Sequence, residues 1–448
     1  MSGGGETIEE TQKLTTLRDV EEYVGIRERV IDRGVGGSCR DRVEDFLVME
    51  KPSRNTYIPL TIVGECPECR EYHRGRECPE CGQDLRRPRL RPQFGGRGPH
   101  TLFYLEKYDW DTMKAVRRIA QALRKHHRHF GIAGMKDKRA VTSQRVTVRG
   151  VPPGVLARLR IRDLKIVPMG RARRKLRPGD LWGNRFVITV RGAKVRRLPE
   201  ALRTVRELGG VPNYYGLQRF GSRRPVTHVV GKYVVLEDWE KAVKTFLTLE
   251  YPRESPEALE ARRWLKEHWG EFKEALRRFP KFLDYERHIL EHLARHPHDY
   301  INAFRRLPMW IRRMFVHAYQ SYLFNRILSE RIARGLPVHR PVEGDVTQDG
   351  LPTVPLPGFR TELSDGPQGE IEREVLEEEG VRLEDFEIKS MPELSAGGDR
   401  KPALLRVYGL RAEAIGDDTV RFTFSLPRGG YATTVLRELL GSEGVYAD

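Results

Sequence analysis

Five separated stretches of the chain have the apolar–polar alternation or apolar enrichment that is typical of β-strands, whose successive side chains point to opposite faces. The first, 44–50 (EDFLVME), is predicted to be a half-buried strand. Further strands are predicted at 101–108, 145–149, 181–192 and 420–426. The predicted strands therefore lie in the first half of the chain and again near its C-terminus.

Helical periodicity dominates the middle of the chain, from 237 to 336, and its longest segment, 314–334, should end at Gly335. An earlier helix is predicted to begin near Asp109 or Asp111, either of which could cap it. Strands on both sides of a helical middle predict an α+β core that is interrupted by an inserted domain. The apolar residues that would share one face of the earlier helix are Met113, Val116, Ile119, Ala120 and Leu123.

The chain has a large positive charge. Its 448 residues include 80 Lys and Arg against 63 Asp and Glu, which gives a net charge of +17. Such a surplus favours a polyanionic partner, above all nucleic acid, over a merely solvated basic surface. No run of eighteen apolar residues occurs, and the N-terminus is polar, without the apolar core of a signal peptide. We therefore expect a cytoplasmic protein that does not bind membranes.

Four of the five cysteines form the pattern C-x₂-C-x₈-C-x₂-C: Cys66, Cys69, Cys78 and Cys81. Each C-x₂-C brings two thiolates to the tip of a tight turn, and two such turns supply the tetrahedral S₄ set that Zn²⁺ prefers. Two disulfides are a poor alternative in a cytoplasmic chain. Because four protein ligands leave no open coordination position, the predicted zinc is structural.

Three residues near these turns have less certain roles. Gly82 suits a left-handed turn position directly after the second pair. His73, between the pairs, could replace one thiolate, although a surface position is the simpler interpretation. Cys39 has no partner in the pattern and is expected to be a free thiol.

Asp137 is the one carboxylate in the segment GMKDKRA (134–140), where Lys136, Lys138 and Arg139 surround it. These cations favour the ionised carboxylate, and carboxylates act as covalent catalysts at sugar-linked carbons. Taken alone, the pattern favours a solvated turn aspartate whose charge the neighbouring cations neutralise.

The segment GMKDKRAVTSQ (134–144) resembles the signature of the TruD family of pseudouridine synthases. Further segments resemble that family in the same order, and the likeness extends from about residue 40 to the end of the chain. These segments are EDFLVME (44–50), GNRF (183–186), VPNYYGLQRFG (211–221), AYQSYLFNRIL (318–328) and LPRGGYATTVLREL (426–439).

The resemblance implies that Asp137 is the catalytic residue and that no cofactor is needed for catalysis. Tyr431 departs from the pattern, because a phenylalanine is the residue most readily aligned there, and the cysteine hairpin is an addition to the simplest members. The residues that the resemblance places at the target nucleotide are Phe46, Asn184, Phe186, Tyr431 and Lys136.

The resemblance also implies a fold: a catalytic core with a mixed, largely antiparallel sheet, an inserted α/β TRUD domain and a small zinc-ribbon hairpin. We expect a flexible tail at 1–15 and the N-terminal part of the core at 16–211, with the zinc ribbon inserted at 62–98. The inserted domain should span 212–400, and the C-terminal part of the core 401–448.

The expected partner is tRNA, with the uridine at position 13 as the implied target, and no protein partner is implied. We expect the inserted domain to add a large share of the RNA-binding surface. The main alternative is a non-catalytic zinc-ribbon RNA-binding protein. A methyltransferase would need a glycine-rich loop for its nucleotide cofactor, and no G-x-G-x-x-G occurs.

Overall fold

The structure is a computed structural model, and it describes residues 14, 16–31, 33–221, 224–441 and 444–445. The flexible tail expected at 1–15 lies outside these described residues, apart from Leu14.

The chain divides into two compact units. The sheet unit comprises the described residues of 31–211 and 405–446, and the helical unit comprises those of 1–30 and 212–404. The short strands β10 (Gly210–Pro212) and β14 (Leu404–Arg406) lie where the chain passes from one unit to the other. The sheet unit is therefore built from two segments that the helical unit separates in sequence.

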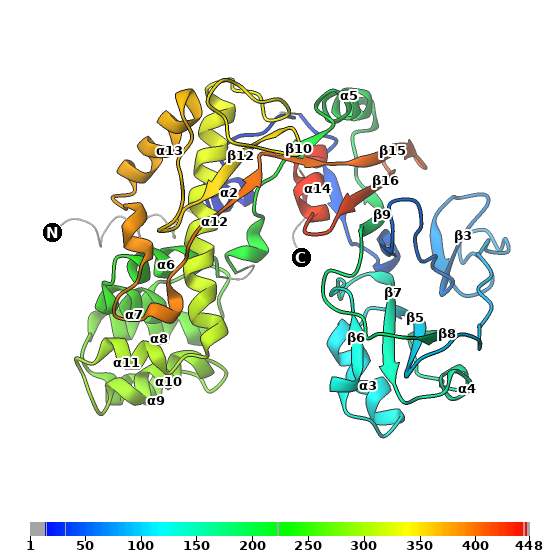
Figure 1. Cartoon of the computed structure of the whole chain (residues 1–448), viewed down its shortest axis with the longest axis horizontal. Coiled ribbons are helices and arrows are strands. Elements are labelled where there is room, and N and C mark those ends of the chain that lie inside the picture. Colours follow the sequence, from blue (N-terminus) through cyan, green and yellow to red (C-terminus); the bar gives the residue numbers. More distant parts are fainter. Residues whose placement is uncertain (1–13, 15, 32, 222–223, 442–443, 446–448) are drawn as a thin grey trace. The chain divides into compact units, whose positions relative to one another are not determined.

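A ten-stranded sheet forms the core of the sheet unit, in the order β15-β16-β9-β2-β7-β5-β8, with β1 beside β9 and β17, and β6 beside β7. Its pairs are antiparallel except β2–β7 and β1–β17, so the mixed, largely antiparallel sheet of the expected α+β fold is confirmed. Figure 1 shows β7, β5 and β8 side by side, with α3 and α4 near them. The strands are β1 (Gly37–Cys39), β2 (Phe46–Lys51), β5 (His100–Tyr108), β6 (Phe130–Ile132), β7 (Val141–Arg149), β8 (Leu164–Ala172), β9 (Gly183–Arg191), β15 (Tyr408–Ala414), β16 (Val420–Pro427) and β17 (Gly444–Val445).

All six residues of β2 are buried, so the expectation of a half-buried strand was wrong. The physical reason is that β2 lies in the middle of the sheet, between β9 and β7, and both of its faces are covered. Leu47 and Met49 pack in a cluster with Val141 and Val187 on one face, while Phe46 packs against Phe186.

The helix α3 (Thr112–Ala122) covers part of this sheet. Asp111, rather than Asp109, caps it, because the Asp111 carboxylate accepts a hydrogen bond from the backbone N–H of Lys114 at 2.8 Å. Val116, Ile119 and Ala120 of the predicted face pack in one cluster with residues of β5, β7 and β8. The other helices of the sheet unit are α4 (Pro153–Ala157), α5 (Leu198–Leu208) and α14 (Ala432–Leu440).

In the helical unit, the long helix α12 (Met309–Ala333) begins five residues before the predicted start at 314. Pro308 is the N-cap residue, and in the added first turn the guanidinium of Arg312 donates to the carbonyl of Leu307 at 3.1 Å and to Glu393 at 2.9 Å. Gly335 follows the helix end, as expected. The other helices are α2 (Leu17–Tyr23), α6 (Thr227–Val235), α7 (Trp239–Thr248), α8 (Pro256–Glu267), α9 (Phe272–Arg278), α10 (Asp284–Leu293), α11 (Tyr300–Arg305) and α13 (Gly366–Glu378).

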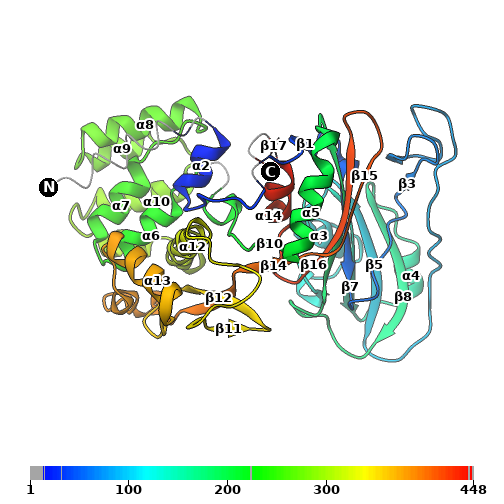
Figure 2. The ribbon, with the colours of Figure 1, turned by 90° about the horizontal axis from the view of Figure 1, so that it is seen from above.

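A three-stranded antiparallel sheet accompanies these helices, formed by β11 (Thr347–Gln348), β12 (Leu351–Leu356) and β13 (Asp399–Pro402). Figure 2 shows β11 and β12 beside α12 and α13, seen from above. Among the described residues, no helix is both long enough and apolar enough to span a membrane. Single 3₁₀ turns occur at Val43–Asp45, His127–His129, Val195–Arg197, Leu217–Arg219, Leu383–Phe386 and Pro392–Leu394.

The segment of α2 belongs to the helical unit, whereas the expected domain division placed residues 16–30 with the core. Side chains of α12 hold it there: Asn325 donates to the carbonyl of Val24 at 3.0 Å, and Ser329 donates to that of Gly25 at 2.9 Å. The sequence of α2 does not by itself indicate these partners, which lie about 300 positions later in the chain.

Candidate active site and metal-binding cluster

Asp137 lies on the loop 133–140, which joins β6 to β7. Buried polar groups hold the backbone of this loop. Lys107, at the end of β5, donates its ammonium to the carbonyls of Asp137 and Lys136, and Thr112 accepts a hydrogen bond from the backbone N–H of Lys136 at 3.1 Å. Gln144 of β7 donates to the carbonyl of Gly134 at 3.2 Å. The loop is therefore fixed from three elements, β5, α3 and β7.

Burial lowers the pKa of Lys107 to about 8, and the charge of Asp137 opposes this shift. A buried ammonium loses its hydration, which favours the neutral amine, whereas a nearby carboxylate favours the cation. The ammonium that anchors the loop therefore loses its proton at a lower pH than an exposed lysine does.

The Asp137 carboxylate has a cationic partner. Its Oδ1 accepts from Nη2 of Arg40 at 3.0 Å, and the Arg40 side chain is only 7% exposed while that of Asp137 is 32% exposed. The guanidinium also lies over the Phe46 ring, 4.1 Å from its centroid. Arg40 thereby orients the carboxylate from the protein interior and leaves part of it accessible to a substrate.

Lys136 is buried, and its side chain takes part in an ion-pair network. Its Nζ lies 3.5 Å from Oε2 of the buried Glu50, and Nε of Arg145 donates to the other Glu50 oxygen at 2.8 Å. Burial lowers the pKa of Lys136, and Glu50 opposes the shift. Lys136 is thus directed at Glu50, although the resemblance placed it at the target nucleotide.

Two of the three expected aromatic residues, Phe46 and Phe186, lie together in the interior. The centroids of Phe46 and Phe186 are 6.3 Å apart in an edge-to-face arrangement, and Phe186 stacks on Phe424 at 5.4 Å. Phe46 is only 1% exposed, and Phe186 is also buried. These rings form the apolar floor beneath Arg40. Because both rings are buried, a base can contact them only after the side chains that cover them have moved.

Asn184 lies opposite Glu50 of β2 and opposite Leu426 of β16 in the sheet register. Its Oδ1 is buried and accepts no hydrogen bond from the described residues. An amide oxygen without a donor is costly in a protein interior, and such a group often serves a ligand. Asn184 is therefore suited to accept from an N–H of a bound base.

Three turns lie near Asn184, where β9 begins and β2 and β16 end. The backbone N–H of Gly179 donates to the carbonyl of Ala133 at 2.8 Å, at the start of the Asp137 loop. The backbone N–H of Arg428 donates to the carbonyl of Trp182 at 2.8 Å. Tyr431, three residues farther along, precedes α14 and is 53% exposed. The structure thus brings the segments of Asp137, Asn184 and Tyr431 to the same end of the strands.

Arg40, Lys107 and Glu50 were not among the residues singled out from the sequence. Arg40 is 97 positions from Asp137, and no local pattern joins them. Of these three residues, only Lys107 has a signal in the sequence. Glu106 and Lys107 are a charged pair in the otherwise uncharged segment TLFYLEKY, and both residues are buried.

The predicted cysteine ligands form a cluster of two overlapping groups beside the hairpin of β3 (Val63–Glu65) and β4 (Tyr72–Arg74). Cys66, Cys78 and Cys81 form one group, and Cys69, His73 and Cys78 form the other. The Sγ atoms of Cys66 and Cys81 are 3.4 Å apart, and those of Cys69 and Cys78 are 3.7 Å apart. Tetrahedral Zn–S bonds of roughly 2.3 Å imply S···S separations of about 3.8 Å, so the cluster could bind a metal ion.

The two cysteine turns have matching backbones. Arg70 donates its N–H to the carbonyl of Cys66 at 3.1 Å, and Gly82 donates to that of Cys78 at 2.9 Å. Both residues have positive φ, 63° for Arg70 and 73° for Gly82. His73 is buried, with Nε2 3.6 Å from Sγ of Cys69, so the simpler expectation of a surface histidine was wrong. Cys39 is buried and lies outside this cluster.

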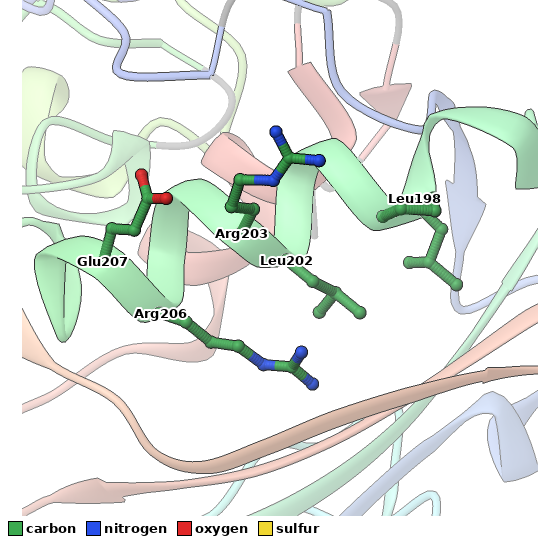
Figure 3. Close-up of a pocket in the computed structure, with 6 residues that line it drawn as sticks. Leu198, Leu202, Arg203, Arg206 and Glu207 are labelled. Carbon is green, nitrogen blue, oxygen red and sulfur yellow. The ribbon is translucent and has the colours of Figure 1, made fainter.

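A shallow groove of about 450 Å³ runs along α5, lined by residues that include Leu198, Leu202 and Arg206 (Figure 3). None of the predicted site residues lines it, and its walls come from one helix. The groove therefore does not belong to the candidate active site.

Comparison with known proteins identifies the same family over most of the chain. The family model of tRNA pseudouridine synthase D (TruD) matches residues 24–350 and 347–439. The probable tRNA pseudouridine synthase D of Methanosarcina mazei is 36% identical, over 94% of this chain and 97% of the relative. The probable tRNA pseudouridine synthase D 1 of Methanocaldococcus jannaschii is 40% identical, over 93% of this chain and 98% of the relative.

A crystal structure of a TruD protein from Methanosarcina mazei matches the fold with a TM-score of 0.78 at 35% identity, covering 94% of this chain and 98% of that one. Matches of this identity and coverage include the loop of Asp137 and both segments of the sheet unit. The chain therefore belongs to the tRNA pseudouridine synthase D (TruD) family.

Proposed function

We propose that this protein is an isomerase that converts a uridine of tRNA to pseudouridine, with Asp137 as its catalytic carboxylate. The observation that carries the proposal is the placement of Asp137: a partly exposed carboxylate on a loop fixed by Lys107 and oriented by the buried Arg40. A carboxylate held rigidly and paired with a guanidinium is ready to react without reorganisation.

The reaction breaks the bond from N1 of uracil to C1′ of the ribose and forms a bond from C5 to C1′. C5 loses a proton and N1 gains one, so the product is an isomer of the substrate. The carboxylate of Asp137 can act as nucleophile or as base in this sequence. In either role, Arg40 neutralises its charge in the resting enzyme and fixes its direction.

The proposed nucleotide pocket adjoins this loop. Asn184 would accept a hydrogen bond from the base, since its Oδ1 is buried without a donor among the described residues. Tyr431 would stack on the base from solvent, and Phe46 and Phe186 would form the pocket floor. Lys136, which the resemblance places at the nucleotide, would instead support the loop through Glu50.

We further propose the uridine at position 13 as the target and the cytoplasm as the location. The sheet unit would be the catalytic core, and 212–400 the inserted domain. The cysteine cluster would hold a structural zinc through Cys66, Cys69, Cys78 and Cys81, a donor set of the type that zinc prefers, with two S···S distances close to those of a tetrahedral site. The metal would stabilise a hairpin too short to bury its own core and take no part in the reaction.

Site-resolved mapping of pseudouridine on unmodified tRNA, without added cofactor, tests the proposal. The wild type should modify one uridine, and Asp137→Asn should lower turnover below detection while tRNA binding persists. The matched control is Asp417→Asn, the same change at an exposed carboxylate in the β15–β16 turn, which should leave turnover unchanged. Wild-type turnover by Asp137→Asn would refute the catalytic assignment. If the wild type modified no RNA, the zinc-ribbon RNA-binding alternative would be favoured.

A further inference from the structure

The positive charge of the chain is concentrated in one part of the sheet unit. Residues 86–177 contain 26 Lys and Arg against 5 Asp and Glu, a net charge of +21 that exceeds the +17 of the whole chain. Residues 212–404 contain 30 basic and 31 acidic residues and are nearly neutral. This distribution argues against the expectation that the inserted domain supplies a large share of the electrostatic attraction for RNA.

The basic loop 86–99 lies against the edge strand β8. Gln93 bridges to Met169, and its backbone N–H donates to the carbonyl of Pro168 at 2.8 Å. The backbone N–H of Arg171 donates to the carbonyl of Gly95 at 2.7 Å. These bonds fix the loop at positions 93 and 95, one on each side of Phe94.

Two glycines allow this close approach. A Cβ at Gly96, where φ is +91°, would lie 2.8 Å from the carbonyl oxygen of Arg171. A Cβ at Gly98, where φ is +127°, would lie 2.3 Å from that of Ala172. A side chain at either position would clash with the backbone of β8. The glycines of the segment QFGGRG therefore allow the loop to lie directly against this strand.

Phe94 is 57% exposed on this fixed segment. Exposed arginines precede and follow it in the loop, at 89, 91 and 97, and Arg173 and Arg174 at the end of β8 are also exposed. A large apolar ring held in water costs free energy, whereas a ring among guanidinium groups suits a nucleotide, whose base can stack while its phosphates meet the cations.

We propose that Phe94 is a stacking platform for an unpaired nucleotide of the bound RNA, and that the arginines of loop 86–99 and the end of β8 bind its flanking phosphates. The proposal rests on the proposed function, since it takes the bound RNA to be the tRNA substrate. It places a contact outside the loop of Asp137, in a segment that the catalytic assignment does not use.

Binding of unmodified tRNA to the full-length protein tests the proposal over a range of salt concentrations. Phe94→Ala should weaken binding roughly 5- to 100-fold without changing the salt dependence, and Phe94→Trp should bind as the wild type does. Arg97→Gln should lower the salt slope by about one. The matched control is Phe282→Ala, which removes an equally exposed ring (61%) from the nearly neutral helical unit and should change little.

Unchanged tRNA affinity in Phe94→Ala would overturn the inference. If the wild type still formed pseudouridine in that case, the proposed function would stand without it. Loss of affinity for poly-glutamate but not for tRNA in Phe94→Ala would assign the surface to an acidic protein segment and also overturn it. A wild type that bound no tRNA would remove both proposals together.

Discussion

The guanidinium of Arg40 lies 3.0 Å from the carboxylate of Asp137 and 4.1 Å above the ring of Phe46. One buried side chain thus contacts both the proposed catalyst and the floor of the proposed pocket. This geometry assigns Arg40 to positioning, because it acts through the carboxylate that it orients.

Replacing Arg40 with Gln should lower kcat by about 10²- to 10³-fold, the typical cost of losing one preorganised charged donor, and should change KM little. Arg40→Lys should recover only part of the rate, because an ammonium lacks the planar donor pair. Steady-state kinetics on tRNA provides both constants. Arg42→Gln, two residues along and half-exposed, is the matched control; a loss confined to KM in Arg40→Gln would contradict the positioning role.

Lys107 should titrate with a pKa of about 8 in the folded protein, because burial disfavours its ammonium. Asp137 opposes this effect, so Asp137→Asn should lower the pKa of Lys107 further. NMR of lysines labelled with ¹³C at Cε would follow the titration in both proteins. A Lys107 pKa that stays near 10 would show that the group is solvated and does not anchor the loop as described.

The same shift predicts a pH dependence of stability. The folded pKa of about 8 lies below the ordinary value of 10.5, so the unfolded chain binds more protons between these pH values. The free energy of unfolding should therefore rise with pH across this window, by at most about 3 kcal/mol. Urea denaturation of wild type and Lys107→Met at pH 7.5 and pH 10 would isolate the contribution; no difference between the two pH profiles would exclude it.

Cys78→Ser should release the metal, whereas Cys39→Ser should not, because Cys39 lies outside the cluster. The role of His73 can be decided by replacing zinc with Co²⁺, whose thiolate charge-transfer absorption reports the number of sulfur ligands. We expect this absorption to be unchanged in His73→Gln and reduced in Cys69→Ser. A higher thiolate signal in His73→Gln would make His73 a ligand. Chelation should leave turnover measurable.

We expect Phe46→Ala to lower the stability of the protein and Tyr431→Ala to lower its activity. Phe46 is buried, so its truncation should cost about 3–5 kcal/mol of stability, measured by thermal or urea unfolding. Tyr431 is exposed, so Tyr431→Ala should keep the stability and lose kcat/KM by the equivalent of about 1–3 kcal/mol. Tyr431→Phe should retain activity, because the ring remains. Full activity in Tyr431→Ala would remove it from the pocket.

Much of the local structure could be predicted from the sequence. The two C-x₂-C turns, a helix cap at Asp109 or Asp111 and five strands of the ten-stranded sheet follow from spacing and alternation over a few residues. The same holds for the loop that carries Asp137, because its segment and its surrounding charges are continuous in sequence. These features depend on residues that are neighbours in the chain, so a short sequence pattern is enough to predict them.

The burial of these residues and their partners depended on the tertiary structure. The alternation at 44–50 fits a half-buried strand, but the central place of β2 in the sheet buries every residue from 46 to 51. Arg40 reaches Asp137 across 97 positions, and Lys107 reaches the same loop across 30. Phe94 is fixed only because its loop follows β8. Contacts between distant segments depend on how the strands pair, and no pattern within one segment encodes its partner.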